Sequence, residues 1–334
     1  MATKPRPRTD AAADRLRVDV RVTNGDASSL LEDARAGFSS VPKSIPPKYF
    51  YDERGSKLFA AICDLPEYYL TRTEQALLDE RAEEVIALTR PTHLVEIGSG
   101  SARKTRTLLD AIAGAGLRTA YLPLDVSEPT LRQSSLALLG EYPWLRIHGL
   151  VGDYERDLDL IPPGDRRLVA FLGSTIGNLD PRQTSRFLKR LAARLGPRDH
   201  LLLGTDLVKP RAVLEAAYDD PAGVTAEFNL NLLGVLNREL RADFDPMGFE
   251  HVAFYNARAA RIEMHLRARR AQRVRVASLG RTFRFAPDER MRTEISRKFT
   301  RASVERMLGA AGFRLLRWIT PDNGWFALSL SRRW

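Results

Sequence analysis

The residues Val95 to Gly100, VEIGSG, have the types and spacing of a ligand-binding turn. Residues 93–98 have the apolar run of a buried strand, and residues 104–113 have the pattern of a helix. Glycines between a strand and a helix let the backbone approach a ligand closely. A dinucleotide site would carry a third glycine where Arg103 stands, so the sequence disfavours a nicotinamide dinucleotide.

Three carboxylates suit a ligand with an amino-acid end, two ribose hydroxyls and an adenine. Glu96 precedes Gly98 and Gly100 in the order Glu-x-Gly-x-Gly. Asp125 ends the next predicted strand, where its carboxylate can accept from both ribose hydroxyls. Asp153 ends the strand after that, where it can accept from the adenine amino group. The pattern resembles the signature of class I methyltransferases, whose cofactor is S-adenosylmethionine.

Each of these residues also has an ordinary structural interpretation. A single aspartate at a strand end is commonly a turn residue. The order of Asp125 and Asp153 after the glycine turn favours the cofactor instead. Lys104, at the start of the predicted helix, is either a solvated side chain or a ligand of the cofactor's carboxylate, and the sequence leaves both open.

The order of elements predicts an α/β fold with a doubly wound, Rossmann-like sheet of the class I methyltransferase type. Strand and helix patterns alternate from residue 93 to residue 206, which is typical of a parallel sheet wrapped by helices. Strands are predicted at 93–98, 119–125, 145–152, 168–174 and 200–206, and helices at 104–113, 128–141 and 182–195.

The alternation stops after Lys209. A helix at 224–240 leads to the strand-like runs HVAFYNA, RIEMHLRA and VRVASLGRTFRF, which are typical of an antiparallel meander. A helix at 303–311 and the runs FRLLRWIT and WFALSLSR resemble the last helix and closing hairpin of the first sheet.

We therefore expect three parts in the chain. Residues 1–19 are polar and are expected to be disordered. Residues 72–208 plus 299–334 are expected to form the cofactor-binding domain. Residues 20–71 plus 209–298 are expected to form a second, substrate-binding lobe, with a ligand cleft between the two.

A capping box is predicted where the first domain begins. Thr71 has the type of an N-cap residue, and Glu74 follows it three residues later. Leu78, Ala82 and Val85 then recur at helical spacing. The sequence thus predicts a helix that starts at Thr71.

Composition limits the classes of partner. Cys63 is the single cysteine, and the histidines lack metal-binding spacing, so we expect no metal. No stretch approaches the roughly 20 apolar residues of a membrane helix, and the first residues lack a secretory signal. We expect a monomer that is cytoplasmic and has no membrane partner.

The net charge of +10 raises the question of a nucleic-acid partner. The densest basic run, residues 267–276, has no aromatic residues for base stacking and is typical of a solvated strand surface. Asn178, in FLGSTIGNLD, stands where methyltransferases acting on nucleobases often carry a Pro-Pro-aromatic motif. Both observations disfavour nucleic acid, which stays an alternative together with an inert cofactor-binding module.

Six separated segments, from about residue 30 to the C-terminus, carry a more specific resemblance. The segments are PKYFYDERGSKLFAAICDLPEYYLTRTE, VEIGSGSARKTRTLL, PLDVSEPTL, FLGSTIGNLDP, ARIEMHLRA and MRTEISRKF. Together they resemble the histidine-specific N-alpha-methyltransferases of ergothioneine biosynthesis. Leu70, where the family pattern has proline, and Arg297 are two departures that affect loop stiffness rather than chemistry.

The resemblance implies S-adenosylmethionine-dependent trimethylation of the alpha-amino group of L-histidine to hercynine. A relative acting on tryptophan-type amino acids is the nearest alternative. By resemblance, Tyr51 is the catalytic residue, which faces both the cofactor and the substrate amine. Asn178 and Tyr218 would hold the substrate carboxylate.

The resemblance also implies a pocket for the imidazole ring. Tyr68, Glu294 and Ser296 would hold the ring, and Met264 would form an apolar wall. Glu294 and Ser296 are two residues apart in an extended segment, so their side chains are expected to share a face. Without the resemblance, the tyrosines and Met264 could equally be core residues and Asn178 a turn residue.

Overall fold

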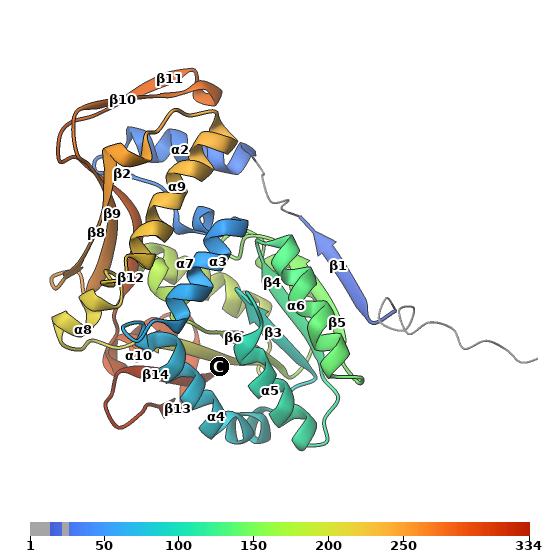
Figure 1. Ribbon diagram of the computed structural model, residues 1–334. Helices are drawn as coiled ribbons and strands as arrows, with labels where there is room; N and C mark the ends of the chain where they lie inside the picture. Colours follow the sequence, from blue (N-terminus) through green and yellow to red (C-terminus); the bar gives the residue numbers. More distant parts are fainter. Residues whose placement is uncertain (1–13, 22–26) are drawn as a thin grey trace, which may run out of the picture.

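The computed structural model describes residues 14–21 and 27–334 and is built around one large mixed sheet (Figure 1). The strand order is β1-β5-β4-β3-β6-β7-β14-β13, with β14 antiparallel to both of its neighbours. The five strands predicted between residues 93 and 206 coincide with β3 to β7 apart from a few residues at their ends. The strands are β1 (Leu16–Val20), β3 (His93–Ile97), β4 (Ala120–Asp125), β5 (Arg146–Val151), β6 (Arg167–Phe171), β7 (His200–Asp206), β13 (Phe313–Ile319) and β14 (Phe326–Arg333).

Helices cover both faces of this sheet, as a doubly wound fold requires. Buried residues of α4, α5 and α6 share one apolar cluster with the sheet, and those of α7 and α10 share another. Every residue of β6 is buried, because a central parallel strand is covered on both faces. The helices are α4 (Tyr69–Thr89), α5 (Arg103–Gly114), α6 (Glu128–Glu141), α7 (Pro181–Arg194) and α10 (Arg301–Gly309). The predicted doubly wound sheet is confirmed.

A smaller sheet, of order β2-β12-β9-β8, stands beside the large one with α9 packed on it (Figure 1). A third apolar cluster joins residues from Leu30 to Leu70 with residues from Leu214 to Met291. Its elements are β2 (Lys43–Ser44), β8 (Phe249–Asn256), β9 (Arg261–Ala268), β12 (Arg290–Arg297), α2 (Ala27–Ser39), α3 (Glu53–Asp64), α8 (Arg211–Ala216) and α9 (Val224–Leu240).

Two segments form strands that differ from the sequence predictions. Leu16–Val20 forms β1, which pairs in parallel with β5, so the expectation of disorder over residues 1–19 is wrong for this segment. Residues 1–13 lie outside the described part. The run VRVASLGRTFRF is not a strand of the meander but contributes to a separate hairpin of β10 (Gln272–Val276) and β11 (Arg281–Phe285). The meander's third strand is β12.

The predicted capping box at Thr71 is also wrong. Helix α4 begins at Tyr69, and its N-cap residue Tyr68 makes no side-chain capping bond. Glu74 is fully buried, pairs with Lys104, and its two carboxylate oxygens share a hydrogen bond from the backbone N–H of Gly173. The long-range partners of Glu74 replace the local capping bond. Among the described residues, no helix is long and apolar enough to cross a membrane.

A buried ion pair at the amino ends of β6 and β7 allows a stability test. The Arg167 guanidinium lies 2.6 Å from Oδ2 of Asp199, and both side chains are almost fully buried. Replacing Asp199 with Ala leaves a buried arginine unpaired and should lower the free energy of unfolding by about 3–5 kcal/mol. The exposed pair of Asp165 and Arg198 is the control, and Asp165→Ala should cost less than about 1 kcal/mol. Urea unfolding measures both; equal losses would contradict this account.

Candidate active site

The glycine turn after β3 has room for a ligand. Gly98 and Gly100 have φ angles of 71° and 49°, and no atom lies within 4 Å of where a Cβ would be at either position. The hydroxyl of Ser99 between them is buried and has no hydrogen-bond partner in the described structure. An open cradle with an unpartnered hydroxyl is what a cofactor with a polar end requires. The sequence reasoning missed Ser99, although it lies inside the predicted motif.

Asp125 borders the same turn at the end of β4. Its Oδ2 accepts a hydrogen bond of 2.9 Å from the Gly100 N–H, and its Oδ1 accepts one of 2.9 Å from the Ser127 N–H. Burial raises the pKa of the Asp125 carboxyl, and these backbone donors oppose the rise. Each oxygen keeps a further lone pair, so the carboxylate can still accept hydroxyl groups of a ligand.

Glu96 lies at the start of the turn with its side chain in the core. Its Oε2 accepts hydrogen bonds of 2.5 Å from both Thr105 Oγ1 and Tyr121 Oη. Burial raises the pKa of the Glu96 carboxyl to about 7. Glu96 therefore ties β4 and α5 to β3.

The other two predicted cofactor residues are already engaged in ion pairs. Asp153 Oδ2 lies 3.0 Å from the Nζ of Lys48, which is in the short 3-10 helix η1 (Pro47–Phe50). Lys104 pairs with the buried Glu74 of α4. Both lysines neutralise a carboxylate beside the predicted cofactor site, so a ligand there must share or displace these contacts.

Local packing fixes the position of Tyr51, directly after η1. Phe50 is fully buried, with its ring centroid 4.6 Å from that of Phe228 on α9. Asp52 caps α3 by accepting a hydrogen bond of 2.8 Å from the Gly55 N–H. A Cβ on Gly55 would lie 1.7 Å from the Phe50 carbonyl oxygen, so only glycine permits this tight turn.

The Tyr51 ring is packed among other aromatic side chains. It packs edge-on against Phe59 and Phe228, at centroid distances of 5.4 and 5.9 Å. Burial raises the pKa of the Tyr51 hydroxyl well above its usual value, and the negative charges of Glu294 and Asp125 act in the same direction. Tyr51 is therefore a neutral hydroxyl near neutral pH rather than a phenolate. Phe59 and Phe228 were not predicted from the sequence.

The register of β9 and β12 places the predicted ring-binding residues together. Glu294 is opposite Met264, and Ser296 is opposite Ile262, after an irregularity in β12 between Arg292 and Glu294. The expectation that Glu294 and Ser296 share a face is consistent with this alternation. Burial raises the pKa of the Glu294 carboxyl to about 7, although the nearby charge of Lys298 lowers it.

Two further tyrosines extend the aromatic surroundings toward Ser296. Tyr68 is almost fully buried, and its ring packs edge-on against Phe59 and Tyr218, at 6.2 and 6.1 Å. The Tyr218 hydroxyl lies 2.8 Å from Ser296 Oγ. A row of rings thus runs from Phe59 through Tyr68 to Tyr218, whose hydroxyl contacts Ser296.

Asn178 ends the short 3-10 helix η3 (Thr175–Asn178), which packs against β12. A Cβ on Gly177 would lie 3.0 Å from the carbonyl oxygen of Arg297, so the glycine allows this close approach. Within the described chain, no residue forms a hydrogen bond with the side chains of Tyr51, Tyr68, Asn178 or Glu294. Polar side chains with unused hydrogen-bonding capacity are suited to binding a polar substrate.

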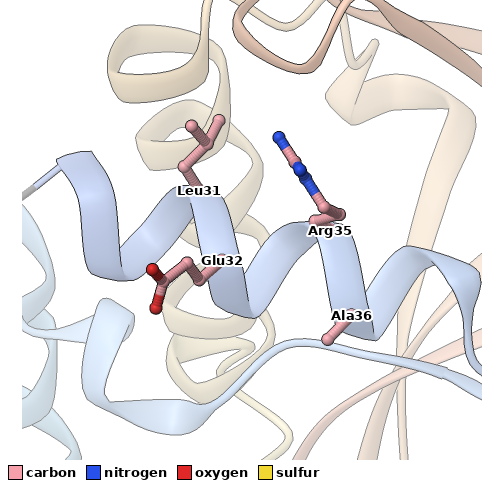
Figure 2. Close-up of a pocket in the computed structure, with 4 residues that line it drawn as sticks. All are labelled: Leu31, Glu32, Arg35 and Ala36. Carbon is pink, nitrogen blue, oxygen red and sulfur yellow. The ribbon is translucent and has the colours of Figure 1, made fainter.

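A surface pocket of about 400 Å³ lies elsewhere, on α2. Figure 2 shows the four residues that line it, Leu31, Glu32, Arg35 and Ala36, all from this one helix. None of the predicted cofactor or substrate residues lines this pocket. It is therefore separate from the candidate active site.

Four features define a class I S-adenosylmethionine-dependent methyltransferase. They are the order of the large sheet, its antiparallel β14, the open glycine turn after β3 and the carboxylate at the end of β4. The family model for histidine-specific, S-adenosylmethionine-dependent methyltransferases matches residues 30–333, so the chain belongs to this family.

Named relatives agree with this family. The chain is 52% identical to the histidine N-alpha-methyltransferase of Mycolicibacterium smegmatis, over 92% of this chain and 96% of the relative. It is 29% identical to ergothioneine biosynthesis protein 1 of Schizosaccharomyces pombe, over 81% of this chain and 36% of that protein. Among solved structures, a methyltransferase from Streptomyces caelestis is 15% identical with a TM-score of 0.44, over 77% of this chain and 89% of its own.

The geometry of the glycine turn predicts a cofactor defect in Asp125→Ala. Removing a charged acceptor for ribose hydroxyls should cost about 1.5–3 kcal/mol of binding, which is roughly a ten- to hundredfold weaker Kd. Calorimetry with S-adenosylhomocysteine measures this loss. Asp110→Ala is the control, because Asp110 accepts from Tyr142 on the outer side of α5. Unchanged affinity in a folded Asp125→Ala variant would remove Asp125 from the site.

Proposed function

We propose that this protein transfers three methyl groups from S-adenosylmethionine to the alpha-amino group of L-histidine, giving hercynine in the first step of ergothioneine biosynthesis. Family membership and the 52% identical relative support this activity. The observation that favours histidine over other amino acids is the β9–β12 register, which groups Glu294, Ser296 and Met264. A carboxyl and a hydroxyl beside an apolar wall suit a ring that has one N–H and one bare nitrogen.

When bound, S-adenosylmethionine supplies an electrophilic methyl group. Gly98, Gly100 and Asp125 would hold its amino-acid end and ribose, since the turn is open and the carboxylate has unused lone pairs. Glu96 would add an acceptor at the turn. The proposed cofactor-binding set also includes Lys104 and Asp153, each of which would have to share or exchange its present ion-pair partner.

The substrate amine must present a lone pair, although an alpha-amino group is largely protonated near neutral pH. Tyr51, as a neutral hydroxyl, would accept a hydrogen bond from the amine and orient it, which contributes to rate without a phenolate base. The rings of Phe59 and Phe228 surround Tyr51. Aromatic faces favour cations, so they would tolerate a nitrogen that gains methyl groups and a permanent charge.

The remaining residues would hold the two ends of histidine. Asn178 and Tyr218 would donate to the carboxylate. Tyr68, Glu294 and Ser296 would contact the imidazole, against the wall formed by Met264. We propose that residues 20–71 plus 209–298 act as the substrate-binding lobe and residues 72–208 plus 299–334 as the cofactor-binding domain.

We propose a cytoplasmic monomer without a nucleic-acid or membrane partner, and the prediction that no metal takes part stays a prediction. A panel of amino acids incubated with S-adenosylmethionine, with mass spectrometry for gains of one to three methyl groups, tests the substrate. Methylated tryptophan without methylated histidine would favour the tryptophan-type alternative. A strongly salt-dependent complex with nucleic acid would revive the nucleic-acid alternative.

The role of Tyr51 predicts a defect in turnover. Tyr51→Phe keeps the ring but deletes the hydroxyl, so kcat should fall about ten- to hundredfold while histidine binding changes less. Steady-state kinetics and calorimetry with histidine separate these two effects. Tyr142→Phe is the control, because the Tyr142 hydroxyl binds Asp110 instead. Equal kcat in wild type and Tyr51→Phe would show that the hydroxyl has no part in the reaction.

The role of Glu294 predicts a change in selectivity. Glu294→Ala combined with Met264→Val removes the polar ring contact and widens the wall, so kcat/KM should fall for histidine relative to tryptophan by at least about tenfold. Glu263→Ala is the matched control, since Glu263 is on the same strand as Met264 but is paired with Arg261. A ratio that stays constant in the double variant would place ring selection elsewhere.

A further inference from the structure

A buried lysine lies behind the proposed substrate residues. Lys298, just after β12, has a fully buried side chain. Its Nζ donates hydrogen bonds of 2.9 Å to Ser296 Oγ and 3.1 Å to Tyr218 Oη, and it forms an ion pair of 2.8 Å with Asp206 Oδ2. An ammonium group has three N–H donors and no acceptor. The Lys298 ammonium group is therefore engaged by three oxygens, each on a different residue.

Asp206, at the end of β7, anchors this lysine from behind. It also pairs with Lys209, and its two carboxylate oxygens share the single O–H of Tyr69, at 2.8 and 3.0 Å. Two ammonium groups thus face one carboxylate in a buried cluster. Lys209 contacts Asp206, Tyr69 and a backbone carbonyl, but neither Tyr218 nor Ser296.

Counting protons shows what Lys298 imposes on the two hydroxyls. Tyr218 and Ser296 each accept one N–H from Lys298, and they lie 2.8 Å apart, so one of them donates to the other. Of their two O–H protons, one is used between them and one is left for a ligand. If Ser296 donates to Tyr218, then Tyr218 has its proton free and Ser296 offers a lone pair.

We propose that Lys298 is a positioning residue: because it donates to both hydroxyls, only one O–H proton of the pair is left for the substrate, and in the arrangement that fits histidine Tyr218 donates that proton to the substrate carboxylate while Ser296 accepts an imidazole N–H. The inference rests on the proposed function. The opposite arrangement would leave Tyr218 without a proton for the carboxylate. The excess positive charge beside Tyr218 favours an anion on this side of the site.

A consequence for Glu294 follows from this arrangement. In this arrangement one N–H of the substrate imidazole is directed at Ser296. The other imidazole nitrogen then faces Glu294, and one proton lies between that nitrogen and the Glu294 carboxylate. Lys298 is the charged neighbour that lowers the pKa of the Glu294 carboxyl, while Tyr51, Tyr68 and Tyr218 around it have raised pKa values and stay neutral. Loss of Lys298 should therefore raise the pKa of Glu294.

The test compares Lys298→Met with Lys209→Met in the full chain. Both variants remove one lysine from Asp206, but only Lys298→Met removes donors from Tyr218 and Ser296. We expect KM for histidine to rise about tenfold or more in Lys298→Met, with kcat at saturating histidine and KM for S-adenosylmethionine within about twofold of wild type. Lys209→Met should leave KM for histidine within about twofold.

Two further measurements separate positioning from a structural role. In a Tyr218→Phe/Ser296→Ala background, Lys298→Met should have less than about twofold effect on KM for histidine, because its targets are absent. The pH above which histidine binding weakens should move to a higher value in Lys298→Met, because the pKa of Glu294 rises there. It should not move in Lys209→Met. If Lys298→Met does not fold, Lys298→Gln, which keeps a donor without the charge, takes its place.

The outcomes distinguish this inference from the proposed function. If wild type methylates histidine and Lys298→Met or Lys298→Gln shows unchanged KM for histidine, the positioning role is overturned. Equal KM changes in the Lys298 and Lys209 variants would overturn it too, because they would show a general effect of the Asp206 cluster. If wild type does not methylate histidine at all, the proposed function fails first.

Discussion

The pairing of Asp206 with two lysines is the constraint on which the union of the two sheets depends. Asp206 ends the central strand β7, Lys298 follows β12 of the small sheet, and Tyr69 opens α4. Fully buried charges are costly unless each is paired and hydrogen-bonded. These segments therefore stay together in one arrangement, and the proposed substrate residues on β12 are held over the carboxyl end of the large sheet.

Ion pairs also tie the cofactor side of the molecule together. Lys48 of η1 holds Asp153 after β5, and it lies three residues before Tyr51. Lys104 of α5 holds Glu74 of α4 in the same way. Because these contacts involve residues proposed to bind the cofactor, cofactor binding and the position of the Tyr51 segment are physically linked.

The surroundings of Tyr51 favour orientation over proton abstraction. Burial and the charges of Glu294 and Asp125 all raise the pKa of its hydroxyl, so a phenolate is disfavoured. The neighbouring rings of Phe59 and Phe228 suit a nitrogen that becomes more cationic with each methyl group. Together these features support the proposed role of Tyr51 in aligning the substrate amine.

The sequence by itself determined the alternating strands and helices, the glycine turn and the shared face of Glu294 and Ser296, because periodicity and backbone conformation are local properties. The tertiary structure alone decided what depends on contacts between distant segments. Glu74 has the spacing of a capping residue, yet its burial against Lys104 gives it a different role. Lys298 has the type of an ordinary basic residue in the sequence. Its two hydrogen bonds and its ion pair exist only because β7 and β12 end at the same place, where burial makes every unpaired charge costly.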